Sequence, residues 1–133
     1  MAVGSKRYRR AQEKKATDLM VERRKKVTFV SHELAKSYQT LKTGKFEDTA
    51  LAMHIKKTME KLQSNPFYGV KISSKLWPAD YVRKFQITNL RKCNLSDGWR
   101  LTYTLKGNAV EIVSIVLEWF SHKDYEKRFG YKT

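Results

Sequence analysis

Apolar residues recur with two different periods along this chain, and the change of period separates helices from strands. A short run of β-branched and aromatic residues at Val27–Val30 predicts a strand. Ser31 follows as a helix N-cap, and apolar residues then recur every three or four positions through 34–41 and through 46–63. Pro66 ends the second of these segments. The first half of the folded unit is therefore predicted to be a strand followed by two helices.

The second half alternates with a period of two, which is typical of strands. Val82–Leu90 and Trp99–Leu105 place alternate side chains on opposite faces, and Ala109–Leu117 is apolar on both faces, as a central strand is. Gly107-Asn108 predicts a two-residue hairpin before the last strand, and Glu118–Thr133 predicts a short helix or turn over the sheet. The fold class is therefore α+β, with two antiparallel helices packed on one face of a mostly antiparallel four-stranded sheet.

Chain length and composition limit the fold to one domain, and the charge balance indicates the kind of partner. The 133 residues are too few for two ordinary domains, but 41% hydrophobic residues supply one core. The 28 Lys and Arg against 13 Asp and Glu give a formal charge of +15, which attracts polyanions such as nucleic acid. Ten of these basic residues lie in Lys6–Lys26, which predicts a basic helix outside the core, either a solvated appendage or a polyanion-binding arm. We therefore divide the chain into a helical extension, 1–26, and a folded domain, 27–133.

The sequence also limits where the protein acts and what it holds. It has no apolar run of about 18 residues and no apolar segment behind its basic N-terminus, so we expect neither a membrane span nor a secretory signal. A membrane surface ranks last among the partners, because the basic segment lacks a broad apolar face. Cys93 is the single cysteine, and no Cys/His cluster has zinc spacing. We expect a cytoplasmic protein without a disulfide, metal or other cofactor.

The strand alternation predicts one polar, cationic sheet face. If Phe85, Ile87, Trp99, Leu101 and Tyr103 pack under the helices, hydroxyls, an amide and cations must lie on the opposite face. The residues expected there are Lys84, Gln86, Thr88, Arg100, Thr102 and Thr104. Cations neutralise phosphates and neutral donors orient them, so this face suits a nucleic-acid backbone. The alternative is a sheet face that is simply exposed to water.

The C-terminal segment adds groups for proton transfer and base stacking. His122 is the histidine whose position allows it to reach the polar face, and imidazole exchanges protons near neutral pH. Tyr125 supplies a flat ring for an unpaired base and a hydroxyl for a phosphate or a proton relay. Either residue can instead belong to aromatic packing with Trp119 and Phe120, and both interpretations stay open.

Several of these features occur in the order found in one known family. The strand-helix-helix opening precedes Asp97-Gly98-Trp99-Arg100-Leu101-Thr102-Tyr103, which is similar to a Gly-Tyr-Arg-Leu-x-Tyr pattern. The Gly107-Asn108 hairpin and the closing His122-Lys123-Asp124-Tyr125 complete the set. In this order and spacing, Val27 to Arg128 resembles the RelE/ParE superfamily of bacterial and archaeal toxins. The basic N-terminal segment lies outside the resemblance.

The resemblance implies a toxin of a type II toxin–antitoxin pair. Such a protein cuts mRNA in the ribosomal A site, contacts rRNA and is neutralised by a small antitoxin protein. By position, Arg100 matches the arginine that contacts the scissile phosphate, and His122 and Tyr125 match residues of acid–base transfer or base stacking. Some members carry paired lysines where this chain has Gln86 and Thr88. The RNA contacts that we expect in this chain are Lys84, Gln86, Thr88, Thr102, Lys123 and Arg128.

The expected chemistry is metal-independent, and it competes with two other functions. In the expected reaction an RNA 2′-hydroxyl attacks the adjacent phosphorus, with His122 as acid or base and Arg100, with Lys84 or Lys123, holding the charge. One rival is a non-catalytic relative that inhibits gyrase or another protein through its surface. The other is a nucleic-acid-binding protein that uses the same basic surfaces without cleavage.

Overall fold

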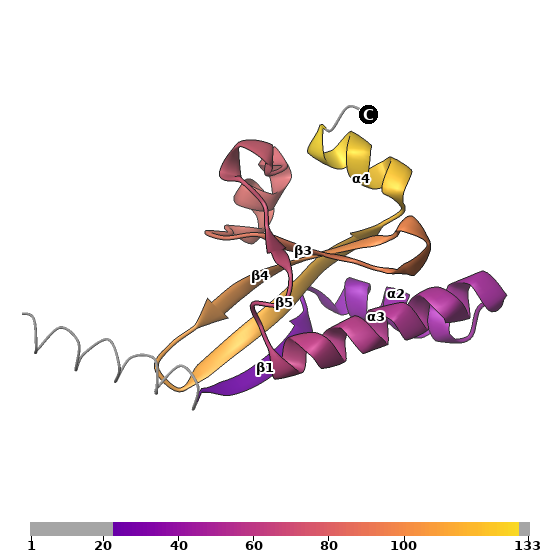
Figure 1. The fold of residues 1–133 in the computed structure, drawn as a ribbon, viewed down its shortest axis with the longest axis horizontal. Coiled ribbons are helices and arrows are strands. Elements are labelled where there is room, and N and C mark those ends of the chain that lie inside the picture. The colour runs from indigo at the N-terminus through magenta and orange to yellow at the C-terminus, as the bar shows by residue number, and fades with distance from the viewer. Residues whose placement is uncertain (1–22, 131–133) are drawn as a thin grey trace, which may run out of the picture.

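The computed structural model describes residues 23–130 of the chain, which form a sheet with helices on both of its faces (Figure 1). The helices and strands, in chain order, are β1 (Arg24–Phe29), α2 (His32–Lys42), α3 (Phe46–Ser64), β2 (Val70–Lys71), β3 (Arg91–Asn94), β4 (Arg100–Gly107), β5 (Glu111–Phe120) and α4 (His122–Phe129). Three short helical turns join them, at η1 (Ser74–Leu76), η2 (Tyr81–Phe85) and η3 (Ser96–Gly98).

The sheet has five strands in the order β1-β5-β4-β3-β2. β1 is an edge strand and runs parallel to β5, whereas all other neighbours are antiparallel. The α+β class is therefore confirmed, but the predicted count of four strands is wrong. The extra strand is β2, whose two residues pair with β3 and are too few to produce an alternating pattern in the sequence.

The helix side of the sheet is the one that the sequence predicts. Ser31 caps α2 by accepting a hydrogen bond from the Leu34 N–H at 3.1 Å, and α3 ends at the residue before Asn65-Pro66. The buried residues shared by α3 and the strands include Ile55, Leu62, Leu101, Tyr103 and Val116. Figure 1 shows α2 and α3 lying together along one side of the sheet. This helical layer supports β4 and β5 on one face of the sheet.

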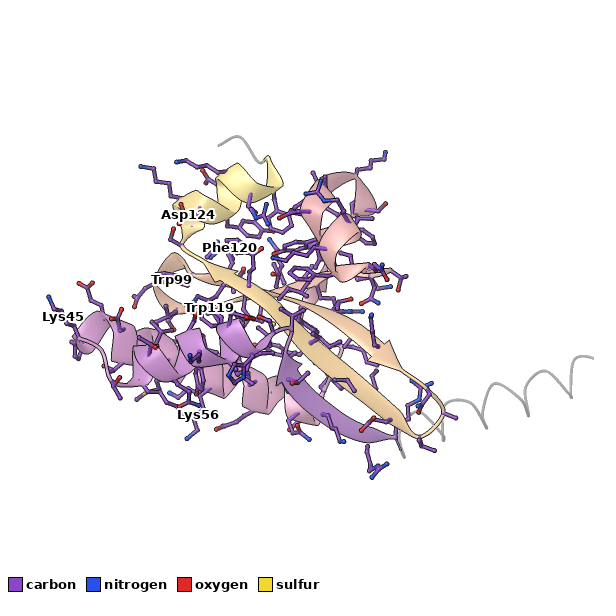
Figure 2. All side chains as sticks on the ribbon, turned by 180° about the vertical axis from the view of Figure 1, so that it is seen from behind. Lys45, Lys56, Trp99, Trp119, Phe120 and Asp124 are labelled. Atoms are coloured by element: carbon purple, nitrogen blue, oxygen red, sulfur yellow. The ribbon has the colours of Figure 1, made fainter. Side chains whose placement is uncertain are left out.

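The opposite face of the sheet is covered, so the prediction of an open polar face is wrong. A second core packs there between η2, the loop after it and α4, and it consists of Ile72, Tyr81, Ile87, Leu90, Leu117, Phe120, Tyr125 and Phe129. Thr102 and Thr104 point into this core and are 0% and 2% exposed. In Figure 2, Trp119 lies on the side of the helices and Phe120 on the side of α4. Alternation identified the two faces of β4 correctly, but it does not indicate which segment covers each face.

The predicted strand Val82–Leu90 is also wrong. Its first part belongs to the helical turn η2, which ends at Phe85 and is followed by Gln86 in a left-handed conformation with φ 52° and ψ 45°. Tyr81 anchors this turn because its ring is fully buried and contacts Phe85 at 5.6 Å between centroids. The third strand of the sheet is β3 instead, which begins at Arg91. Lys84 and Gln86 therefore leave the sheet face on which they were expected.

The first strand and the last hairpin differ from their predicted bounds by a few residues. β1 begins at Arg24 rather than Val27, and Arg24–Lys26 pair with β5, so the boundary at 26/27 falls inside a strand. Residues 6–22 of the predicted basic helix lie outside the described residues. The β4–β5 loop spans 108–110 and is closed by Asn108, whose Oδ1 accepts hydrogen bonds from the Val110 and Glu111 N–H groups. Within residues 23–130, no helix is both long and apolar enough to cross a bilayer.

Candidate functional site

Three polar side chains meet at the corner where β4 begins and β5 turns into α4. Arg100 is the first residue of β4 and pairs with Phe120, and His122 is the first residue of α4. The Arg100 Nη2 lies 3.3 Å from His122 Nδ1, and His122 Nε2 lies 2.7 Å from Glu126 Oε1. His122 is exposed, so this chain of contacts lies at the surface. The structure thus brings together two of the predicted catalytic residues.

The contacts of His122 fit one neutral tautomer. A guanidinium has donors and no acceptor, so the contact between Arg100 Nη2 and His122 Nδ1 is a hydrogen bond when Nδ1 holds a lone pair. In that tautomer Nε2 carries the proton and donates a hydrogen bond to the Glu126 carboxylate. A neutral imidazole in this tautomer presents a basic nitrogen next to a guanidinium. That combination can accept a proton from a hydroxyl while the guanidinium binds a neighbouring anion.

A lysine and the ring of Tyr125 extend the cluster below the surface. Lys92 Nζ lies 5.1 Å from the centroid of the Tyr125 ring, and Arg100 Cζ lies 6.0 Å from the same centroid. Tyr125 is 3% exposed, and its ring stacks on Phe129 at 4.6 Å. Partial burial, with the Arg100 charge as a second cause, lowers the pKa of Lys92 below its usual range. Two cations therefore lie close together over one buried aromatic ring.

The Arg100 side chain is held in position by the backbone of the two preceding residues. Its Nη1 donates hydrogen bonds to the carbonyl oxygens of Gly98 and Trp99 at 2.8 and 3.2 Å, which leaves Nη2 directed at His122. Gly98 has a positive φ of 78°, and a Cβ placed there would lie 3.4 Å from the His122 Cβ. The η3 turn therefore both fixes the guanidinium and lets α4 begin close beside it.

Two other predicted RNA contacts have structural roles instead. The Thr102 hydroxyl lies 2.9 Å from the Tyr81 hydroxyl in the second core, where no RNA can reach it. The Arg128 guanidinium pairs with Asp80 at 2.6 Å and with Glu118 at 3.2 Å. These pairs attach α4 to the residue that precedes η2 and to β5. Tyr125 is likewise part of the aromatic packing that covers the sheet, so its ring is not an open platform for a base.

The remaining predicted contacts fall at different places. Lys123 is exposed on the first turn of α4, directly after His122. Lys84 and Gln86 are exposed on and after η2, and Thr88 lines a cavity near the other end of β4. The structure therefore joins Arg100, His122 and Tyr125 in one cluster, leaves Lys123 beside it and separates Thr88 from it.

Sequence reasoning missed Lys92 and Glu126. Lys92 pairs with Thr102 across β3 and β4, while its neighbour Cys93 points to the opposite, helix-facing core. A correct assignment of β3 would have placed Lys92 on the face of Arg100. Glu126 lies four residues after His122, and this spacing puts two residues on the same side of a helix. That signal was present once a C-terminal helix was expected.

Metal-binding potential and similarity to known proteins add little to this geometry. Among the residues that the structure describes, no group of three or more His, Cys, Asp or Glu side chains is arranged to hold a metal ion. No family model matches the chain, and the searches of curated proteins and of solved structures gave no significant match.

Proposed function

We propose that this protein is a metal-independent endoribonuclease that cuts mRNA in the ribosomal A site, as the toxin of a type II toxin–antitoxin pair. The observation that carries the proposal is the cluster of Arg100, His122 and Glu126 with Lys92 beside it. A base, a partner that orients it and two cations are the groups that RNA cleavage by its own 2′-hydroxyl requires.

In the proposed reaction, His122 Nδ1 takes the proton of the ribose 2′-hydroxyl. The freed O2′ forms a bond to the adjacent phosphorus, and the bond between phosphorus and O5′ breaks. The leaving O5′ takes up a proton, which Lys92 is suited to supply because its lowered pKa makes its ammonium a stronger acid. The products are a 2′,3′-cyclic phosphate and a 5′-hydroxyl, so atoms and charges balance.

Arg100 acts on the phosphate in this mechanism. Its guanidinium binds the non-bridging oxygens and stabilises the extra charge that the phosphorane carries. Arg100 must then exchange its contact with His122 Nδ1 for one with the phosphate, which frees that nitrogen for the hydroxyl. Lys123, which is exposed beside His122, would contact the neighbouring phosphate of the strand.

The wider assignment comes from the family resemblance and from charge. A formal charge of +15 favours rRNA and mRNA as partners, and a small protein antitoxin would neutralise the toxin by covering the cluster. Both partners belong to the cytoplasm, which is the location we propose. Thr102, Tyr125 and Arg128 support the site through packing and ion pairs rather than by touching RNA.

Induced expression followed by primer extension on cellular mRNAs tests the proposal. Native protein should arrest growth and produce cuts inside translated codons, and Arg100→Ala should abolish both. Arg83→Ala is the matched control, because Arg83 is an exposed arginine on η2 and takes part in none of the cluster contacts described above. Growth arrest with intact mRNA, accompanied by inhibition of DNA supercoiling by the purified protein, would contradict the proposal in favour of gyrase inhibition.

A further inference from the structure

A cavity of about 530 Å³ lies at the end of β4 opposite to Arg100. It is bounded by the end of β4, by β2 and by the loop that leads into β3. Leu105 lines the cavity and is five residues after Arg100 on β4. On an extended strand this spacing corresponds to about 17 Å. The cavity is therefore separate from the cluster of Arg100 and His122.

The charge of this cavity has one sign. Four cationic side chains line it, and no carboxylate is among the residues that the structure describes there. The four are Arg23, Lys71, Arg91 and Lys106. Arg23 Nε is buried and has no hydrogen-bond partner within residues 23–130. A cationic lining with an unused buried donor favours an anionic ligand.

The walls of the cavity are aromatic as well as cationic. Phe67 is 45% exposed, and the Arg91 guanidinium lies 5.3 Å from the centroid of its ring. Trp77 also lines the cavity, and its Nε1 donates a hydrogen bond to the Ile72 carbonyl at 2.9 Å. Aromatic rings interleaved with cations are the combination that binds unpaired bases and their phosphates. A duplex, whose bases are stacked on each other, cannot use these rings.

The cavity is formed in advance by a fixed loop. The Asn89 side chain pairs with the backbone of Leu105 in both directions, with distances of 2.8 Å to its N–H and its carbonyl. The Thr104 hydroxyl donates to the Asn89 carbonyl at 2.7 Å. These bonds tie the loop before β3 to the end of β4, so the aromatic and cationic walls keep their spacing without a ligand.

We infer that this cavity binds a nucleotide of single-stranded RNA, with its base against Phe67 and Trp77 and its phosphates on Lys71, Lys106 and Arg91. The inference rests on the proposed function only in taking this RNA to be the same strand that is cut at Arg100. The cavity would then hold the strand several nucleotides from the cleaved bond. It would raise affinity for the strand without taking part in the chemistry.

The test measures binding of an RNA that cannot be cut. A fluorescent, fully 2′-O-methylated single-stranded RNA of about 12 nucleotides lacks the attacking hydroxyl, so its affinity does not depend on the proposed cleavage. Phe67→Ala should weaken binding about tenfold through loss of base stacking. Its matched control is Phe46→Ala, which removes a ring that is 86% exposed at the start of α3.

A second pair of variants tests the charges. Lys71→Gln with Lys106→Gln should flatten the dependence of log affinity on log salt by about 0.7 for each lysine. Lys36→Gln with Lys56→Gln removes the same charge from exposed positions of α2 and α3, and Lys56 lies on the helix side of the molecule, away from α4 (Figure 2). All four lysines are exposed, so these variants should fold like the native protein.

The outcomes separate this inference from the proposed function. Weaker RNA binding by the cavity variants, with native binding by the control variants, supports the inference. A failure to cut unmodified RNA would contradict only the proposed function. Native affinity in Phe67→Ala and in the Lys71/Lys106 variant would overturn the inference. It would also be overturned if the two control variants lost as much affinity, or if an acidic peptide bound at these residues and RNA did not.

Discussion

In the proposed mechanism, proton transfer at His122 depends on the two groups that flank its ring. Arg100 faces Nδ1 and Glu126 faces Nε2, and this pair of contacts fits the neutral tautomer with its proton on Nε2. The neighbouring Lys92 and Tyr125 give the cluster its depth. At the scale of single residues, the proposal therefore predicts separate consequences for the imidazole and for the lysine.

His122→Ala removes the proposed base and should slow cleavage of ribosome-bound mRNA by about 10²- to 10⁴-fold. The affinity for RNA that cannot be cleaved should stay close to that of native protein, because the variant keeps every lysine and arginine. Single-turnover cleavage in a translation-coupled assay and anisotropy on the same preparations measure the two quantities. Cleavage at the native rate by His122→Ala would remove His122 from the mechanism.

Lys92→Met removes a charge that is costly to keep partly buried. Because the pKa of Lys92 is lowered in the folded protein, the unfolded chain binds its proton more tightly, and stability rises with pH up to the ordinary lysine pKa. The variant should therefore have a larger free energy of unfolding than native protein at pH 7, with a gap that narrows near pH 10. Cleavage should fall about 10²-fold.

Urea denaturation at several pH values and the cleavage assay check both effects of Lys92→Met. Lys84→Met is the matched control, because Lys84 is exposed on η2, and it should change neither quantity much. A Lys92→Met variant that is less stable than native protein at neutral pH, or that cleaves as fast, contradicts the assignment.

At the scale of elements, α4 determines whether the site exists. Ser121 caps it, with Oγ 3.3 Å from the Asp124 N–H, and Tyr125 and Phe129 pack its inner side onto the sheet. Arg128 then attaches its last turn to Asp80 and Glu118. A loosened α4 would carry His122 and Glu126 away from Arg100.

Arg128→Gln should lower the free energy of unfolding by about 1 kcal/mol, as expected for a partly exposed ion pair. Arg128 holds the pKa of Asp80 below its usual range, so this stabilisation is present above that range and is lost as the carboxyl becomes protonated in acid. Thermal or urea unfolding at neutral and acidic pH measures the difference, with Lys127→Gln as the control on the same helix. An equal gap between native protein and Arg128→Gln at both pH values would contradict the role of Asp80.

The elements also mark how far the sequence can be interpreted. The helices 32–42 and 46–64 and the strand β4 follow from apolar periodicity, because each directs its apolar side chains to one side. The alternation in 82–90 is typical of a strand, but the chain forms the turn η2 there, with Tyr81 and Ile87 buried. No sequence pattern indicated the left-handed conformation of Gln86 that follows the turn. Arg100 and His122 were predictable from local motifs, whereas Lys92 needed the register of β3. Burial of Thr102 depends on α4 and η2, which lie far from it in sequence.

At the scale of the whole molecule, we propose that positive charge attracts the protein to RNA and that the RNA binds near both ends of β4. A formal charge of +15 should speed encounter with ribosomes and RNA at low salt. We expect kcat/KM for cleavage to fall steeply as salt rises, while kcat at saturating substrate changes little. Initial rates at several salt concentrations measure this, and a kcat/KM that is independent of salt would contradict electrostatic capture.

The central claim is that an RNA 2′-hydroxyl performs the cleavage. The most direct measurement uses ribosome-bound mRNA with a single 2′-deoxy nucleotide at a mapped cut site, together with analysis of the ends of the unmodified products. We expect the deoxy substitution to abolish cutting at that bond, and the unmodified mRNA to yield a 2′,3′-cyclic phosphate and a 5′-hydroxyl. Cutting at the deoxy position, or products with a 5′-phosphate, would contradict the mechanism.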